Sequence, residues 1–301
     1  MKKTILTVAL VATLASRAFA QGNATAAPAA AAPAAPSSPL SDLTVSASMD
    51  YESQYIFRGK KVTNGAFQPS AQFGYPIYGG SLYVGAWTSQ PLGHAGGGAA
   101  AIPGPNQHNE IDLFGGYTYP LDMITKSLGV DVGYMYYWYP DASAAGSIYG
   151  TSDNQEIHLG FTYDTSNVIP VNLSPTLYFY HDFVLDQNDV EFGLSYTWDL
   201  SSLTGVKGVT LVPSATLGWL GAHNSFGQVF FPGGAHWRNS YTYYKVQLNL
   251  NYQLNSWAQA FIGVRYSGNN DGTAVSATFG SPQAPGSANS IWGGAGLNFS
   301  D

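Results

Sequence analysis

The sequence of 301 residues contains no cysteine. It can therefore form neither a disulfide framework nor a lipidated N-terminal cysteine. Charged residues are also scarce, at 10% of the chain, whereas an ordinary soluble domain has roughly 25%. After residue 20, no apolar run approaches the ~20 residues that a membrane-spanning helix requires. These absences argue against an ordinary soluble domain and against a helical membrane protein.

The N-terminal segment 1–20 has the three parts of a Sec-type signal peptide. Lys2 and Lys3 form a basic start, residues 5–14 form an apolar centre, and residues 18–20 form a small-x-small cleavage pattern. We expect cleavage at the end of this segment and export of the remaining chain. An uncleaved anchor is disfavoured because the apolar centre is too short to span a bilayer.

The next segment, 21–42, is rich in Ala, Pro and Ser and is predicted to be a periplasmic linker, because it cannot build a core. Residues 43–301 are then the main domain. Removal of the signal peptide also removes three of the 11 basic residues and none of the 18 acidic ones, so the net charge falls from −7 to 8 − 18 = −10. This excess argues against nucleic acid or an anionic surface as a partner.

Aromatic residues and glycine are abundant where charge is scarce. Aromatics make up 14% of the chain, with 21 Tyr, and there are 35 Gly. Low charge, many aromatics and no long apolar run are together typical of a transmembrane β-barrel.

Segment 43–58 alternates apolar and polar residues one by one. A barrel strand requires this pattern, because successive side chains face lipid and the water-filled lumen in turn. We expect the odd positions to face lipid and the even positions to face the lumen. The lipid face then includes Met49, Tyr51, Tyr55 and Phe57, and the lumen face includes Asp50, Glu52 and Arg58.

The same alternation recurs along the chain and predicts an all-β, antiparallel, up-and-down transmembrane barrel of about 12 strands. An even number agrees with bacterial barrels. The predicted strands lie in the segments 43–58, 67–75, 80–89, 110–119, 130–138, 156–164, 171–183, 190–200, 208–221, 244–252, 258–266 and 289–299.

The connections between these segments alternate between short and long, as they do in outer-membrane barrels. This asymmetry places both termini in the periplasm and predicts the outer membrane of a Gram-negative-type bacterium. We expect the outer face of the barrel to contact membrane lipid. The short connections are 76–80, 120–127, 165–170, 201–208 and 255–256, and the long ones are 90–107, 140–152, 223–239 and 269–287.

The first hairpin region carries an aromatic-x-Phe-Arg-Gly element, at Tyr55, Phe57, Arg58 and Gly59, followed by Gln68, Pro69 and Phe73. At these residues the chain resembles the TorF-like porins. The resemblance covers roughly the first strand pair, and only the barrel rhythm continues beyond it. It implies an outer-membrane location and passive transport of no defined substrate.

Acidic residues outnumber basic ones on the predicted lumen face. Such an excess raises the local concentration of cations and lowers that of anions. Pairing of acids and bases across the lumen, which would stiffen the wall, is an alternative role. The predicted pore-lining residues are Asp50, Glu52, Arg58, Glu110, Asp112, Asp131, Glu156, Glu191, Lys245 and Arg265.

The three basic residues of this set fall on the first, tenth and eleventh predicted strands. These strands become neighbours when a barrel closes. We therefore expect Arg58, Lys245 and Arg265 to form a basic stripe that faces an acidic wall and acts as a constriction.

The leading functional prediction is a porin-like channel for passive diffusion of small solutes with a mild preference for cations. A closed structural or adhesive barrel that acts through its extracellular loops is a second interpretation. A lipid-modifying enzyme of the outer membrane is a third, weaker one, because His181 lies on the lipid-side parity but has no serine beside it. The sequence predicts no catalytic residue, no cofactor and no metal site.

Overall fold

The computed structural model describes residues 42–92, 109–140, 153–168, 173–184, 186–222, 240–270 and 289–301. The predicted signal peptide, the linker up to residue 41 and most of the long predicted connections lie outside these described residues. Across the described ranges, no helix has both the length and the apolar character needed to cross a bilayer.

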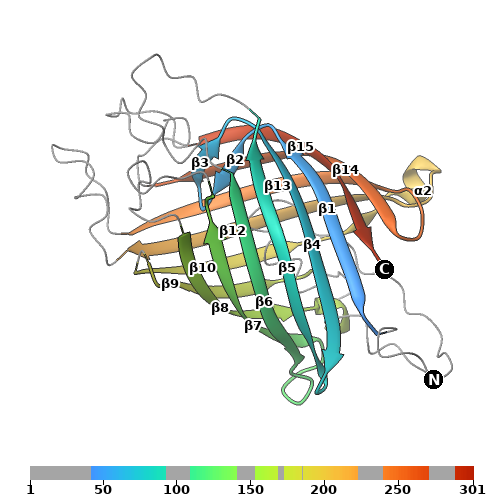
Figure 1. Cartoon of the computed structure of the whole chain (residues 1–301). Helices are drawn as coiled ribbons and strands as arrows, with labels where there is room; N and C mark the ends of the chain where they lie inside the picture. Colours follow the sequence, from blue (N-terminus) through green and yellow to red (C-terminus); the bar gives the residue numbers. More distant parts are fainter. Residues whose placement is uncertain are drawn as a thin grey trace.

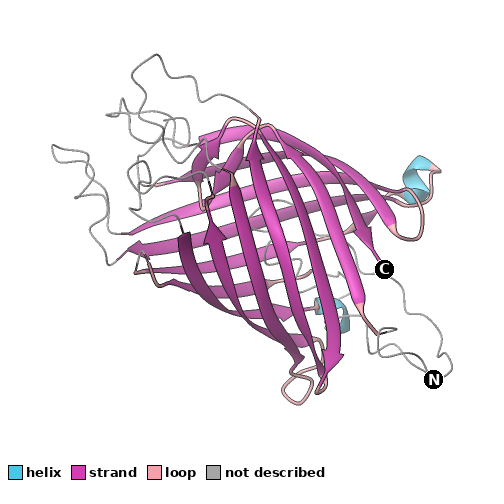
Figure 2. Cartoon of the chain, in the orientation of Figure 1, coloured by secondary structure: helices cyan, strands magenta, loops and turns pink. Residues whose placement is uncertain are grey.

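Twelve of the described strands form one closed antiparallel barrel (Figures 1 and 2). Pairing of β1 with both β4 and β15, and of β10 with β12, closes the wall. The predicted fold class and strand number are confirmed. The barrel strands are β1 (Thr44–Glu52), β4 (Ala66–Ile77), β5 (Gly80–Pro91), β6 (Glu110–Pro120), β7 (Leu128–Trp138), β8 (Asp153–Tyr163), β9 (Thr176–Asp182), β10 (Gln187–Ser195), β12 (Val209–Ala222), β13 (Ser240–Gln253), β14 (Ala258–Asn269) and β15 (Asn289–Ser300).

The two rims of the barrel differ. At the rim where β1 begins and β15 ends, called the terminal rim below, the strands are joined by the connections 78–79, 121–127, 164–175, 196–208 and 254–257. The described residues of these connections hold short elements: η2 (Thr165–Asn167), the two-residue β11 (Trp198–Asp199), which pairs with β12, and α2 (Ser201–Thr204). The opposite rim, called the far rim, carries most of the long predicted connections.

The wall has an apolar exterior and a polar interior, as the alternation predicted. Along β13, for example, Val246, Leu248 and Leu250 are exposed, whereas Gln247, Asn249 and Asn251 are buried. An apolar exterior suits contact with lipid, and a polar interior suits contact with water or with other polar side chains. One strand therefore separates two environments.

Exposed aromatic side chains lie near both rims. Trp198 and Trp257 are exposed at the terminal rim, and Trp138 and Trp219 are exposed toward the far rim. Such rings are favoured at the interfaces of a membrane because they have both apolar and polar parts. Tyr137, next to Trp138 in the sequence, instead points inward and is buried.

Glycines make room for large side chains inside the barrel. A Cβ atom built on Gly160 would lie 2.1 Å from the ring of Tyr178 on the neighbouring β9, and one on Gly218 would lie 2.1 Å from the ring of Tyr243 on β13. These rings therefore lie flat against the wall, so aromatic residues are part of the lumen lining.

The prediction for the first strand was wrong beyond residue 52. The strand β1 ends at Glu52, and the chain then forms a separate two-stranded hairpin, β2 (Tyr55–Phe57) and β3 (Lys60–Thr63). Tyr55 therefore does not face lipid; it is buried inside the barrel with Ile56. The hairpin turns at Arg58 and Gly59, whose φ angles of 47° and 73° are those that a two-residue type I′ turn needs. Alternation continued through β2 because β2 is itself a strand.

Candidate functional site

The hairpin β2–β3 lies inside the barrel near the far rim (Figure 1). At its base, Ser53 exchanges backbone and side-chain hydrogen bonds with Gly293 of β15. Tyr55 packs on Trp87 of β5 at a ring separation of 5.6 Å, and Ile56 packs on Trp292 of β15. The hairpin connects β1 and β4, and its side chains pack on β5 and β15, the strands that flank this pair on either side.

The tip of the hairpin contacts the wall formed by β13 and β14. Asn269 donates a hydrogen bond of 2.7 Å to the carbonyl of Gly59, and the Tyr241 hydroxyl donates one of 3.0 Å to the carbonyl of Arg58. A Cβ atom on Gly59 would lie 2.6 Å from the Cβ atom of Tyr243. Only glycine fits both the positive φ and this close approach.

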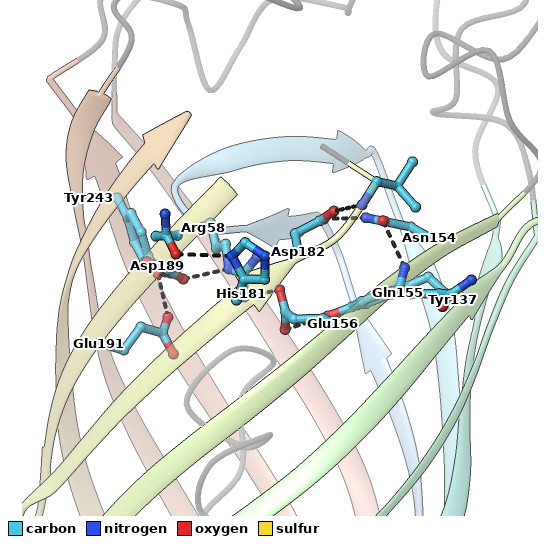
Figure 3. Close-up of polar contacts among 12 residues, drawn as sticks. Arg58, Tyr137, Asn154, Gln155, Glu156, His181, Asp182, Asp189, Glu191 and Tyr243 are labelled. Carbon is cyan, nitrogen blue, oxygen red and sulfur yellow. Dashed lines mark hydrogen bonds and ion pairs between the residues drawn. The ribbon is translucent and has the colours of Figure 1, made fainter. Parts of the chain in front are cut away.

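The side chain of Arg58 reaches to the opposite part of the wall, where Figure 3 shows it among acidic residues. Its Nη2 lies 2.8 Å from Oε2 of Glu156 on β8, and its Nε lies 2.6 Å from Oδ2 of Asp189 on β10. The guanidinium carbon also lies 5.0 Å from the ring centre of Tyr180 and 4.7 Å from that of Phe57. Two carboxylates and two ring faces therefore surround one cation.

The charge of Arg58 is maintained by these partners. Burial lowers the pKa of its guanidinium, but the carboxylates of Glu156 and Asp189 outweigh this effect and hold the pKa well above its ordinary value. Arg58 is therefore charged at physiological pH.

Tyrosines hold the acids of this site in place. The Tyr243 hydroxyl lies 2.7 Å from Asp189 and 2.7 Å from Glu191, and the Tyr137 hydroxyl donates a bond of 3.1 Å to Glu156. Within the described residues, Oδ1 of Asp189 is buried and has no hydrogen-bond partner. This oxygen is an acceptor that the hairpin does not use.

A second ion pair lies at the base of the hairpin. Nη2 of Arg265 on β14 lies 3.0 Å from Oε1 of Glu52 on β1, and the indole of Trp292 donates a bond of 2.9 Å to the other oxygen of Glu52. Lys245 on β13 is also buried. It lies diagonally across from Arg265 on the paired strand β14, because Lys245 pairs with Ser267 and Arg265 pairs with Gln247. The predicted basic stripe of Arg58, Lys245 and Arg265 was wrong. Arg58 lies on the hairpin and not on the wall, so it does not line up with the other two.

The remaining predicted residues also lie inside the barrel. Glu110, Asp112, Asp131 and Glu191 are buried, and Tyr139 donates a bond of 3.2 Å to Glu110. Asp50, which accepts a hydrogen bond from Ser48, lies on the same face of β1 as Glu52. Asp131 also contacts His158, Tyr83 and Tyr178 at 2.9–3.2 Å.

Asp189 was missed because the predicted strand began one residue later, at Val190. In the structure β10 starts at Gln187, so Asp189 shares the inward parity of Glu191. The sequence did offer a signal, because Asp189 lies two residues before Glu191, a predicted lumen residue, and so has the same parity.

Neither a metal cluster nor a nucleophilic site is evident in the described ranges. No group of three or more His, Cys, Asp or Glu side chains there is arranged to hold a metal ion. His181 lies on the outward face of β9, where its Nδ1 lies 3.1 Å from the side-chain oxygen of Asn188 (Figure 3).

Replacement of Gly59 by alanine is expected to release the hairpin tip. A side chain at positive φ costs about 1–2 kcal/mol, and at Gly59 the clash with Tyr243 adds to this. We expect faster amide hydrogen exchange in β2 and β3 and unchanged exchange in the barrel strands. Gly205→Ala is the matched control, because Gly205 has φ +70° but open space around it. If the amides of β2 and β3 exchange equally slowly in wild type and in Gly59→Ala, then the close contact of Gly59 with Tyr243 does not hold the hairpin tip.

The chain is similar to one protein family and to several solved structures. A family model described as "Bacterial protein of unknown function (Gcw_chp)" matches residues 34–196, from before β1 to the end of β10. No curated protein matches the sequence. Among solved structures, the chain is similar to a KdgM porin in complex with disordered oligogalacturonate, with a TM-score of 0.47 and 10% identity over 85% of this chain and 99% of that chain. It is also similar to the NanC porin (TM-score 0.44, 12% identity, 85% and 98% covered) and to OmpT of Vibrio cholerae (0.36, 10%, 86% and 97%).

Proposed function

This chain belongs to the Gcw_chp family of bacterial proteins of unknown function, and we propose that it is an outer-membrane channel. It passes small solutes through the barrel lumen, past the inward-folded hairpin, and prefers cations to anions. The segment Tyr55–Gly59 resembles an element of the TorF-like porins, and this resemblance supports the proposal.

The observation that carries the proposal is the charge of the interior. Among the side chains that the structure describes, eight acidic residues are buried: Glu52, Glu110, Asp112, Asp131, Glu156, Asp182, Asp189 and Glu191. The basic residues described there are Arg58, Lys245 and Arg265. Charges in this number are stable inside a barrel when water or counter-ions reach them. An excess of acids then attracts cations and repels anions.

The apolar exterior supports the membrane part of the proposal. Exposed Leu, Val, Ile and Phe side chains cover the outward positions of the strands, and aromatic rings lie near both rims. A cleaved signal peptide at residues 1–20 would deliver the chain across the inner membrane. The termini and the linker then lie in the periplasm.

The test is conductance and ion selectivity of purified protein in a planar bilayer. We expect stepwise conductance and a reversal potential, in a KCl gradient, that indicates cation preference. The double variant Glu110→Gln/Asp112→Asn should lower this preference at low salt. Each unit charge removed at roughly 10 Å in water is equivalent to about 0.4 kcal/mol, or about a twofold change in local cation concentration.

A matched double variant, Asp122→Asn/Asp301→Asn, removes two exposed carboxylates at the terminal rim and should behave as wild type. Absence of conductance from folded protein would end the channel proposal. An unchanged reversal potential in Glu110→Gln/Asp112→Asn would end the assignment of these acids to the pore.

A closed structural or adhesive barrel is the second candidate, favoured by the burial of the hairpin. Tyr55 and Ile56 are only 3% and 4% exposed, so the hairpin packs as a core element would. This candidate predicts no conductance from wild type, because the packed hairpin would close the lumen.

A further inference from the structure

The contacts of Arg58 are those with which a protein binds a free organic cation. Two carboxylates lie at 2.8 Å and 2.6 Å from its nitrogens, and the ring of Tyr180 lies at 5.0 Å from its guanidinium carbon. Carboxylates match the donors of a planar guanidinium, and an aromatic face attracts the same cation. The guanidinium cage, defined as Glu156, Tyr180, Asp189, Glu191 and Tyr243, is thus filled by the protein's own side chain.

The cage does not depend on the hairpin for its position. Its members lie on β8, β9, β10 and β13 of the barrel wall, and the tyrosine hydroxyls hold the carboxylates from that wall. When Arg58 leaves, the carboxylates of Glu156 and Asp189 lose their cation, and Glu191 still shares the Tyr243 hydroxyl with Asp189. In Figure 3 Glu156 projects from β8, and Asp189 and Glu191 project from β10.

The cage has binding capacity that Arg58 does not use. Oδ1 of Asp189, a residue 1% exposed, has no hydrogen-bond partner among the described residues. Glu191 contacts Tyr243 but makes no ion pair with Arg58 among the pairs observed. A soluble guanidinium can turn its donors in directions that the tethered side chain cannot, and can therefore also reach the free acceptor.

Arg58 is also held in an unfavourable backbone conformation. Its φ of 47° lies in the left-handed region, which residues other than Gly, Asn and Asp rarely adopt. The ion pairs offset this strain. A soluble guanidinium makes the same contacts without the strain, so it can compete with the tethered group.

We propose that the guanidinium cage is a binding site for solutes that carry a guanidinium group, and that Arg58 occupies it as a tethered competitor. A bound solute displaces Arg58 and frees the hairpin tip, which clears the lumen for passage. The passage step rests on the channel function proposed above, whereas the binding step does not. Guanidinium is preferred to ammonium because two planar carboxylate contacts suit a fork of donors.

The test uses Arg58→Asn, because Asn-Gly is a favoured pair for a type I′ turn and the hairpin backbone is retained. Purified protein in detergent is titrated with methylguanidinium in a calorimeter. We expect Arg58→Asn to bind about tenfold or more tightly than wild type, since the competitor that reduces the free fraction of the site is gone. Methylammonium should bind Arg58→Asn several-fold more weakly than methylguanidinium.

Two variants make the result specific. Arg58→Asn/Asp189→Asn should lose the gain in binding, and Lys126→Gln, which removes an exposed cation at the terminal rim, should bind as wild type does. Folding is checked by heat-modifiable migration on gels. If Arg58→Asn does not fold, Arg58→Lys supplies the test, because its single ammonium is a weaker competitor and should still tighten binding.

Equal affinity of wild type and the Arg58 variant would overturn the proposal, and equal affinity for methylammonium would overturn the guanidinium preference. Binding without any bilayer conductance would leave the cage supported and refute the channel. Conductance without binding of methylguanidinium would support the channel and refute the guanidinium cage as a binding site.

Discussion

Removing the β2–β3 hairpin is expected to raise the single-channel conductance several-fold. The variant replaces residues 54–64 with Asn-Gly, which joins Ser53 to Gly65 through a two-residue turn. Glu52 of β1 already pairs with Ala66 of β4, so a short connection fits the existing register. The increase follows because the hairpin contacts strands on several sides of the lumen and therefore occupies its cross-section.

The expected result depends on which contacts the hairpin makes. It touches β5 through Trp87, β7 through Tyr137, and the β8–β10 wall through Arg58. It also touches β13 and β14 through the tip at Gly59. A segment with partners in so many directions leaves little of the lumen at its level open to ions.

Arg58→Asn is the matched control for the deletion, because it retains the hairpin backbone and removes one side chain. Its conductance should lie between those of wild type and the deletion variant. A folded deletion variant with the conductance of wild type would show that ions do not pass the hairpin, and the constriction would have to lie elsewhere.

Leu248→Arg is expected to destabilise the folded barrel by about 2–4 kcal/mol, the magnitude for a basic residue on the lipid face near the centre of the bilayer. Leu248 lies near the middle of β13 and is 40% exposed on its outer face, between Pro213 and Val264 of the adjacent strands. The cost arises because a guanidinium loses water where only hydrocarbon surrounds it. Equilibrium urea titration of the protein in lipid vesicles measures it.

Leu254→Arg is the control for this substitution. Leu254 follows β13 at the terminal rim and is 50% exposed, so its exposure is similar but its depth is not. The same change there should cost about 0–1 kcal/mol, as expected near an interface. Equal losses at both positions would contradict the proposed orientation of the barrel in a membrane.

The separation of the two faces of the wall was predictable from sequence. In a strand the side-chain direction alternates at every residue, so the environment of Leu248 or Asn249 follows from position alone. The inward location of Glu110, Asp112, Asp131, Glu156, Lys245 and Arg265 followed in the same way. The strand number followed because each crossing repeats the pattern.

The hairpin was not predictable in this way. Tyr55 and Phe57 continue the alternation of β1, and a pattern of period two does not reveal that the chain has left one sheet for another. The Arg58-Gly59 pair was visible, but neither residue by itself indicates a type I′ turn as Asn-Gly would.

The sequence by itself determined the barrel, the polarity of its two faces and the excess of acids inside, because each depends on local periodicity and composition. Only the tertiary structure decided that Arg58 crosses the lumen to Glu156 and Asp189 and does not stand beside Lys245 and Arg265. These partners lie about a hundred residues or more away along the chain. Closure of the barrel brings them together, and the close fit of Gly59 against Tyr243 fixes the direction in which the hairpin points.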